Sequence, residues 1–228
     1  MVDRERDVSS VLRRAPLFRT LAPALIARVA ASATVLKVPR GKQICRGGER
    51  SSGFYVAISG RVMLCVGASN EPDKVVELVG SGGHIGLAAA VLGTPEALTA
   101  ETLVDSVLLL IPRAALLDTI AGNHEFALQL IAALSRQVCG LISDIEAFSL
   151  RSGLERVANY LLQVAAAHGP RQHPVALPAK KSIIASRLSL TPEYFSRMLH
   201  ELIEAGAIAV DGRQITVLDP VRLREVAR

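Results

Sequence analysis

Residues 188–219, LSLTPEYFSRMLHELIEAGAIAVDGRQITVLD, carry the most informative pattern of the chain. A short helix over 180–188 leads through a tight turn into a second helix. Thr191 next to Pro192 is typical of a helix start, because Thr is a good N-cap and Pro fits the first helical position. The second helix ends at Gly206, a common C-cap residue. Two short helices joined by a tight turn predict a helix-turn-helix.

Two β-prone runs, IAV and QITV, follow the second helix and flank Asp211-Gly212. Asp-Gly between such runs is a strong signal for a two-residue hairpin with a type I′ turn. A hairpin behind a helix-turn-helix is a wing, and Arg213 at its tip is placed to contact a DNA phosphate. The sequence therefore predicts a winged helix-turn-helix DNA-binding domain over 150–228.

The second helix is predicted to have one apolar and one polar face. The expected inward side chains are Phe195, Leu199, Leu202 and Ile203. The expected outward side chains, spaced i, i+3, i+4 and i+7, are Glu193, Ser196, Arg197 and His200. Arg can bond O6 and N7 of guanine and Glu can accept from N4 of cytosine, while Ser and Thr191 can contact bases or phosphates. The alternative is a solvated face with an i, i+4 ion pair between Glu193 and Arg197, and both interpretations can hold together.

Basic residues gather in the same part of the chain. The net charge is +5, and residues 151–228 hold 11 Lys and Arg against 7 Asp and Glu. A basic terminal domain favours a polyanionic partner such as double-stranded DNA. The expected flanking phosphate contacts are Lys180, Lys181 and Arg187.

The first half of the chain has a different sequence pattern. Short β-prone runs punctuated by glycines occupy residues 34–112, and helices are expected over 11–33. Many short strands with Gly turns predict a β-barrel or sandwich of the jelly-roll kind. The overall fold class is therefore α+β, with an N-terminal β-barrel sensor domain and flanking helices over 1–120.

A long helix over 121–149 is expected to join the two domains. It carries a heptad seam with β-branched residues at one position and mostly Leu at the other: Ile131, Val138 and Ile145, and Leu134, Leu141 and Phe148. This choice favours parallel two-stranded coiled coils, so the seam predicts a homodimer. The alternative is a helix packed on its own domain. A hinge at 149–153 and an amphipathic helix over 154–168 follow.

Several classes of protein do not match the sequence. No apolar run is expected to span a bilayer, and the N-terminus lacks a secretory signal, so we expect a cytoplasmic protein without membrane contact. The scattered Cys45, Cys65 and Cys139 form neither a disulfide framework nor a C-x-x-C metal site. No motif of a known catalytic site is present, so we do not expect an enzyme.

The order of parts resembles the Crp–Fnr family of bacterial transcription regulators over almost the whole chain. The matching segments are PLFRTLAPALIARVA, GKQICRGGERSSGFYVAISGRVML and the segment that begins this section. The resemblance implies a cyclic-nucleotide-binding-like barrel, RNA polymerase as a partner, and TTGA-type half-sites read by Glu193, Ser196 and Arg197. PEYFSRMLHEL and DGRQITVLD resemble the Dnr-type subgroup most, which implies nitric oxide sensing through haem.

The chain departs from the family where the effector is concerned. Members that bind cyclic AMP carry Gly-Glu and Arg-Ser around the phosphate, whereas this chain has Gly86-Leu87 and Glu96-Ala97. Without the Arg we expect no cyclic AMP binding. An iron–sulfur cluster is not expected, because the cysteines are too few and too scattered. Haem stays a candidate cofactor, with His84 as its candidate ligand; a regulator without any effector, and a ligand-binding regulatory subunit of another protein, are the alternatives.

Overall fold

The computed structural model describes residues 2–67, 74–167 and 174–227. The chain forms two compact units, Met1–Cys139 and Gly140–Arg228. Their boundary falls within the longest helix, α5 (His124–Leu150).

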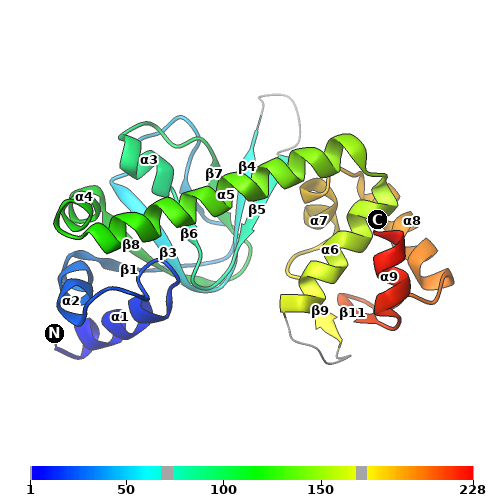
Figure 1. Ribbon diagram of the computed structural model, residues 1–228, viewed down its shortest axis with the longest axis horizontal. Coiled ribbons are helices and arrows are strands. Elements are labelled where there is room, and N and C mark those ends of the chain that lie inside the picture. The colour runs from blue at the N-terminus through cyan, green and yellow to red at the C-terminus, as the bar shows by residue number, and fades with distance from the viewer. Residues whose placement is uncertain (1, 68–73, 168–173, 228) are drawn as a thin grey trace. The chain divides into compact units, whose positions relative to one another are not determined.

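Two antiparallel four-stranded sheets build the first unit (Figure 1). One sheet has the order β1 (Thr34–Val38), β8 (Ser106–Pro112), β3 (Gly53–Ser59), β6 (His84–Ile85). The other has the order β2 (Gln43–Cys45), β7 (Thr99–Thr102), β4 (Val62–Val66), β5 (Lys74–Val79). The helices of this unit are α1 (Val2–Arg14), α2 (Pro23–Ser32), α3 (Leu87–Leu92), α4 (Arg113–Gly122) and the first part of α5. The predicted β-rich domain with flanking helices is confirmed.

The central strand β3 is apolar at nearly every position because both of its faces are buried. Phe54 and Val56 belong to a core cluster shared with the helices, while Tyr55 and Ala57 belong to a cluster shared with the second sheet. Alternate side chains of a strand point to opposite faces. A strand buried on both sides therefore reads as a continuous apolar run.

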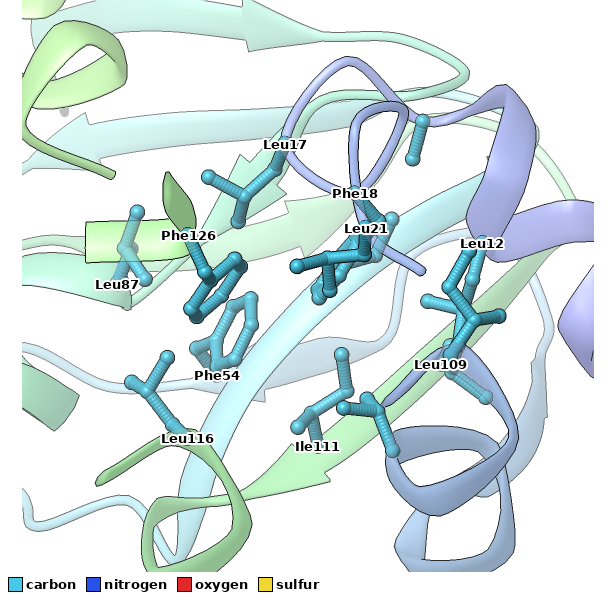
Figure 2. Packing of buried hydrophobic residues seen from close by; sticks show 14 of the residues in the cluster. Leu12, Leu17, Phe18, Leu21, Phe54, Leu87, Leu109, Ile111, Leu116 and Phe126 are labelled. Carbon is cyan, nitrogen blue, oxygen red and sulfur yellow. The ribbon is translucent and has the colours of Figure 1, made fainter. Parts of the chain in front are cut away.

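Three phenylalanine rings fasten the start of α5 to the sheet (Figure 2). Phe18 precedes α2, Phe54 lies in β3 and Phe126 lies in α5, and all three are at most 1% exposed. The ring centroid of Phe18 is 6.4 Å from that of Phe54 and 5.7 Å from that of Phe126. Burying one such side chain stabilises a fold by about 1.5–3 kcal/mol, so this cluster anchors the helix firmly.

A glycine makes the turn between β3 and β4 possible. Gly60 has a φ of +96°, which L side chains rarely adopt. A Cβ at this position would lie 2.7 Å from the Cα of Ser106, so the neighbouring strand leaves no room for a side chain.

The second unit is a small helical domain with a three-stranded sheet. Its elements are α6 (Gly153–Ala167), β9 (Val175–Ala176), α7 (Lys181–Arg187), α8 (Pro192–Glu204), β10 (Ile208–Asp211), β11 (Gln214–Val217) and α9 (Pro220–Val226). The sheet order is β10-β11-β9, and the pair β10–β11 is the predicted wing. The helix-turn-helix of α7 and α8 with a wing behind it is confirmed.

The type I′ turn predicted for the wing is wrong. Asp211 pairs with Gln214 and closes the ladder, so the two loop residues are Gly212 and Arg213. Only Gly212 has a positive φ, +56°, whereas a type I′ turn needs positive φ at both loop residues. Glycine sits first in the loop, and Arg213 takes an ordinary backbone conformation.

The expectation that no segment is apolar and long enough to span a bilayer is also wrong by length and composition alone. Helix α5 has 27 residues, and an 18-residue window of it reaches a mean hydropathy of 1.4. However, Phe126, Leu130 and Ala133 pack into the core cluster of the first unit. A partly buried helix of a folded unit passes the same test of length and composition, so the test alone does not assign α5 to a membrane.

Candidate functional site

The start of α8 is fixed by its own N-cap. The Thr191 hydroxyl oxygen accepts a hydrogen bond from the Tyr194 backbone N–H at 3.2 Å, as the sequence predicts. Pro192 occupies the first turn. Ser189, in the turn between α7 and α8, is the single non-glycine residue with positive φ in the described chain, at +55°. This left-handed residue allows the chain to reverse sharply between the two helices.

The polar face of α8 is exposed as predicted. Glu193, Ser196, Arg197 and His200 are all exposed. The buried side chains of the helix are Phe195, Met198, Leu199 and Leu202. Ile203, predicted to point inward, is 39% exposed, and Met198 takes its place in the core. The hydrophobic stripe is therefore rotated slightly from the predicted one, but the side chains offered to solvent are unchanged.

Arg197 is held by an aromatic ring. Its guanidinium carbon lies 4.6 Å from the centroid of the Tyr194 ring, within the range of a cation–π contact. The ion pairs of the described residues do not include one between Glu193 and Arg197, so the alternative intrahelical pair is not formed. The Ser196 hydroxyl donates to the Pro192 carbonyl at 2.8 Å. Tyr194 was not predicted from the sequence, although its place three residues before Arg197 on the same helix was a signal for this contact.

Of the four side chains predicted to contact phosphates, two, Arg187 and Arg213, bind other groups of the protein instead. Nη2 of Arg187 lies 2.6 Å from Oδ2 of Asp144, at the end of α5 that belongs to the same unit. Nη2 of Arg213 donates to the Leu177 carbonyl at 2.8 Å and braces the loop of the wing. Lys180 is exposed and Lys181 half-buried, each beside the N-terminus of α7.

The apolar residues of α5 divide into two groups. Ile131, Val138 and Ile145 are 58%, 54% and 64% exposed, and Leu141 is 44% exposed. Leu134 packs against the core cluster, and Phe148 is half-buried with the Arg156 guanidinium carbon 5.9 Å from its ring centroid. Leu128 and Ile142, which were not part of the predicted heptad seam, are also exposed. Spacings of three and four residues put Leu128, Ile131, Val138, Ile142 and Ile145 on one helix face, the α5 stripe.

The first unit contains a cavity of about 170 Å³ next to β6 and α3. His84, Gly86, Leu87 and Glu96 are among its lining residues. The side chain of Glu96 is 6% exposed, and its Oε1 is buried without a hydrogen-bond partner. Gly86 has a φ of +74°, and a Cβ on it would lie 2.5 Å from that oxygen. The carboxyl group thus lies directly against the Gly86 backbone, where only glycine leaves space.

Burial shifts the pKa values of the titratable side chains in and near this cavity. It raises the pKa of Glu96, and together with the nearby Glu96 carboxylate it raises the pKa of the Cys45 thiol to about 12. Burial also raises the pKa of Tyr55, and burial followed by the Arg136 charge lowers that of His84. The His84 imidazole is therefore neutral at physiological pH, and Glu96 is the one acidic group among the described lining residues.

The cavity does not fit the cofactors of related regulators. Phosphate sites commonly use Arg or Lys as charged donors, and neither residue type is among the described residues that line the cavity. The volume is also below the ~300–1,000 Å³ of usual ligand pockets, so a haem macrocycle does not fit the cavity as it stands. Within residues 2–67, 74–167 and 174–227, no cluster of three or more potential metal ligands is found.

Comparison with known proteins identifies both units. Residues 35–123 match the model of the cyclic nucleotide-binding domain, and residues 155–226 match that of the Crp-like helix-turn-helix domain. A CRP-like cAMP-activated global transcriptional regulator of Mycobacterium tuberculosis is 24% identical over 224 residues, 97% of this chain and 100% of the relative.

Solved structures extend the likeness. The structure of DNR from Pseudomonas aeruginosa is 32% identical, covers 95% of this chain and 96% of its own, and has a TM-score of 0.50. FixK2 from Bradyrhizobium japonicum is 24% identical, covers 86% of this chain and 98% of its own, and has a TM-score of 0.79. At 24% identity, the likeness to FixK2 concerns the fold alone.

The buried Glu96 carboxyl predicts a pH-dependent stability. Its pKa is raised in the folded protein, so its contribution to stability is lost as pH rises from the ordinary glutamate range through the raised pKa. Glu96→Gln should therefore have a higher free energy of unfolding than the wild type at neutral pH, and the gain should shrink as pH falls. Urea unfolding at a series of pH values measures this difference.

The comparison with wild type isolates Glu96 in acid and neutral solution, because burial, the largest cause of both shifts, keeps the pKa of Cys45 and of Tyr55 above their ordinary values in either protein. The exposed Glu49 is the matched control, and Glu49→Gln should follow the wild-type curve. Parallel curves for wild type and Glu96→Gln would show that the carboxyl is not strained by burial.

Proposed function

This chain belongs to the Crp–Fnr family of transcription regulators, and from that premise we propose that it binds palindromic double-stranded DNA as a homodimer and reads TTGA-type half-sites with α8. The observation that carries the proposal is the exposed Glu193–Ser196–Arg197 face on the first two turns of a capped helix. The N-terminal part of a recognition helix is the part that meets base edges in the major groove. The family consists of regulators, not enzymes.

Each residue of this face has a chemical role in the proposal. Arg197 donates to O6 and N7 of a guanine, and Glu193 accepts from N4 of a cytosine. Tyr194 presents Arg197 to the groove by stacking under its guanidinium. Ser196 and Thr191 contact bases or phosphates, and Lys180 and Lys181 add contacts to phosphates that do not depend on sequence. These roles determine how a substitution of each residue should change the affinity for DNA or the base preference.

The α5 stripe supports the homodimer. Five exposed apolar side chains on one helix face need a cover, and a second copy in parallel supplies an identical stripe. Such a dimer presents two copies of α8, and a two-fold protein reads a palindrome with half-sites about 34 Å apart, one turn of DNA. The proposed division of labour is a sensor over 1–120, a dimerisation helix over 121–149 and a DNA reader over 150–228, acting in the cytoplasm with RNA polymerase as partner.

The regulating signal is proposed to act at the cavity that contains His84 and Glu96. A ligand shifts a regulator only by binding its DNA-competent state differently from its other state. Cyclic AMP is not proposed as the signal, because neither Arg nor Lys is among the described residues that line the cavity. A regulator that needs no effector is the alternative.

Arg197→Ala should cost about 1–3 kcal/mol per half-site and relax the preference for guanine at one position. Competition binding with a set of operator variants measures both effects. Lys181→Ala is the control, because losing a phosphate contact should weaken binding to all sequences equally. If Arg197→Ala kept the wild-type base preference, the assignment of Arg197 would be wrong.

Val138→Glu should separate the dimer, because it places two like charges in the covered α5 stripe at a cost of several kcal/mol. Sedimentation should then show monomer, and specific DNA affinity should fall. Ser143→Glu adds the same charge to an exposed position on a different face of α5 and should stay dimeric. A Val138→Glu protein that is still dimeric at micromolar concentration would place the interface elsewhere.

Asp144→Asn should strengthen binding to DNA of any sequence, because it releases Arg187 from its ion pair for a phosphate contact. The slope of log K against log salt should steepen by about one. Glu146→Gln removes an equal charge from the same helix end but frees no arginine, so it should leave the slope unchanged. Equal slopes for all three proteins would mean that Arg187 does not reach the DNA.

Nitric oxide sensed through haem is a candidate for this signal. The neutral His84 imidazole favours it, since that is the form that binds metals, although the cavity must widen to admit a macrocycle. Under this candidate, protein from haem-replete cells shows a Soret band that is lost in His84→Ala and kept in the exposed control His124→Ala. A wild-type protein without a Soret band would exclude haem.

A further inference from the structure

The cavity of the first unit has one feature that the proposed function leaves unexplained. Glu96 is an acidic side chain more than nine-tenths buried, with an oxygen that has no hydrogen-bond partner. A buried polar group without a partner costs about 1–3 kcal/mol, and more when it is charged. The fold nevertheless holds it firmly, because the Glu96 N–H donates to the Glu49 carbonyl at 2.9 Å and the Glu96 carbonyl accepts from the Gly48 N–H at 2.8 Å.

Gly86 shows that the carboxyl position is built into the local backbone. Any side chain at Gly86 would collide with Oε1 of Glu96 and would also be strained at its φ of +74°. The glycine therefore brings the backbone and the carboxyl group together at the wall of the cavity. An ionised carboxylate only accepts hydrogen bonds, so a donor bound in the cavity would satisfy Oε1 of Glu96.

The remaining walls define the rest of the ligand. They are largely aliphatic, with Leu64, Leu87, Leu92 and Leu98 among the lining residues. The volume of about 170 Å³ admits only a few heavy atoms. An anion is disfavoured by the carboxylate, and a metal ion is disfavoured because no cluster of ligands is found within the described part of the chain. The combination fits a compact molecule with one cationic donor end and one apolar end.

We propose that this cavity binds a small organic cation, a primary ammonium with a short apolar tail, whose ammonium group donates to the Glu96 carboxylate. The tail packs against the leucines, and the ammonium group supplies the donor that Oε1 of Glu96 otherwise has no partner for. Binding itself does not depend on the proposed function. That the cation is the signal that regulates DNA binding does rest on it.

Isothermal titration calorimetry of the full chain with n-butylammonium tests the proposal, at mildly alkaline pH so that Glu96 is ionised. Saturable binding is expected for n-butylammonium, with 1-butanol and butyrate binding far more weakly as neutral and anionic isosteres. Glu96→Gln should weaken n-butylammonium binding by about tenfold or more, since the charge-assisted hydrogen bond is lost. Glu49→Gln, at an exposed position, should bind as the wild type does.

Thermal unfolding by circular dichroism checks that Glu96→Gln is folded before it is titrated. No saturable binding of n-butylammonium to the wild type, equal binding to wild type and Glu96→Gln, or binding of 1-butanol as tight as n-butylammonium would each overturn the proposal. Wild-type affinity for a TTGA palindrome is measured separately. Its absence would overturn the proposed function and leave the calorimetric result standing.

Discussion

The burial of one face of α8 is the constraint on which the rest of the DNA-binding unit depends. Phe195, Met198, Leu199 and Leu202 are each at most 4% exposed, so the helix cannot rotate about its axis without opening the core. The Thr191 cap fixes where the helix starts. Together they determine which side chains face outward, so the predicted reading of DNA follows from core packing rather than from the polar residues alone.

Helix α5 imposes the second constraint. Its first turns are anchored by Phe126 in the aromatic cluster of the sheet unit, while Asp144 near its other end pairs with Arg187 of α7. The same helix exposes the α5 stripe. One continuous helix therefore carries an anchor to the sheet unit, a proposed dimer contact and an ion pair to α7.

Much of the fold was predictable because its signals are local. The strands β1, β3, β4, β5 and β8 appear as β-prone runs, and α8 is framed by a cap residue and a terminal glycine. The strands β2, β6, β7 and β9 have only two to four residues and were missed. Short strands depend on pairing with distant partners, as between Gln43 and Glu101, and such pairing leaves no local pattern.

The details of the candidate site were less predictable, for three physical reasons. Met198 and Ile203 both border the apolar stripe, and helical spacing does not decide which of them the neighbouring elements cover. Arg187 meets Asp144 across 43 residues of sequence, so its ion pair could not be read from spacing. In the sequence, Glu96 indicated only that a phosphate contact of the family was lost. Its burial and its oxygen without a partner, on which the proposed cationic ligand rests, arise from tertiary packing and leave no local pattern.

The central claim is sequence-specific binding of DNA by a symmetric dimer. Selection of preferred sites from a random DNA library, with the full-length protein at physiological salt, tests it most directly. The account predicts enrichment of an inverted repeat of two TTGA-type half-sites whose centres are one helical turn apart, about 34 Å. Enrichment of a single unrepeated motif, or of no motif at all, would contradict it.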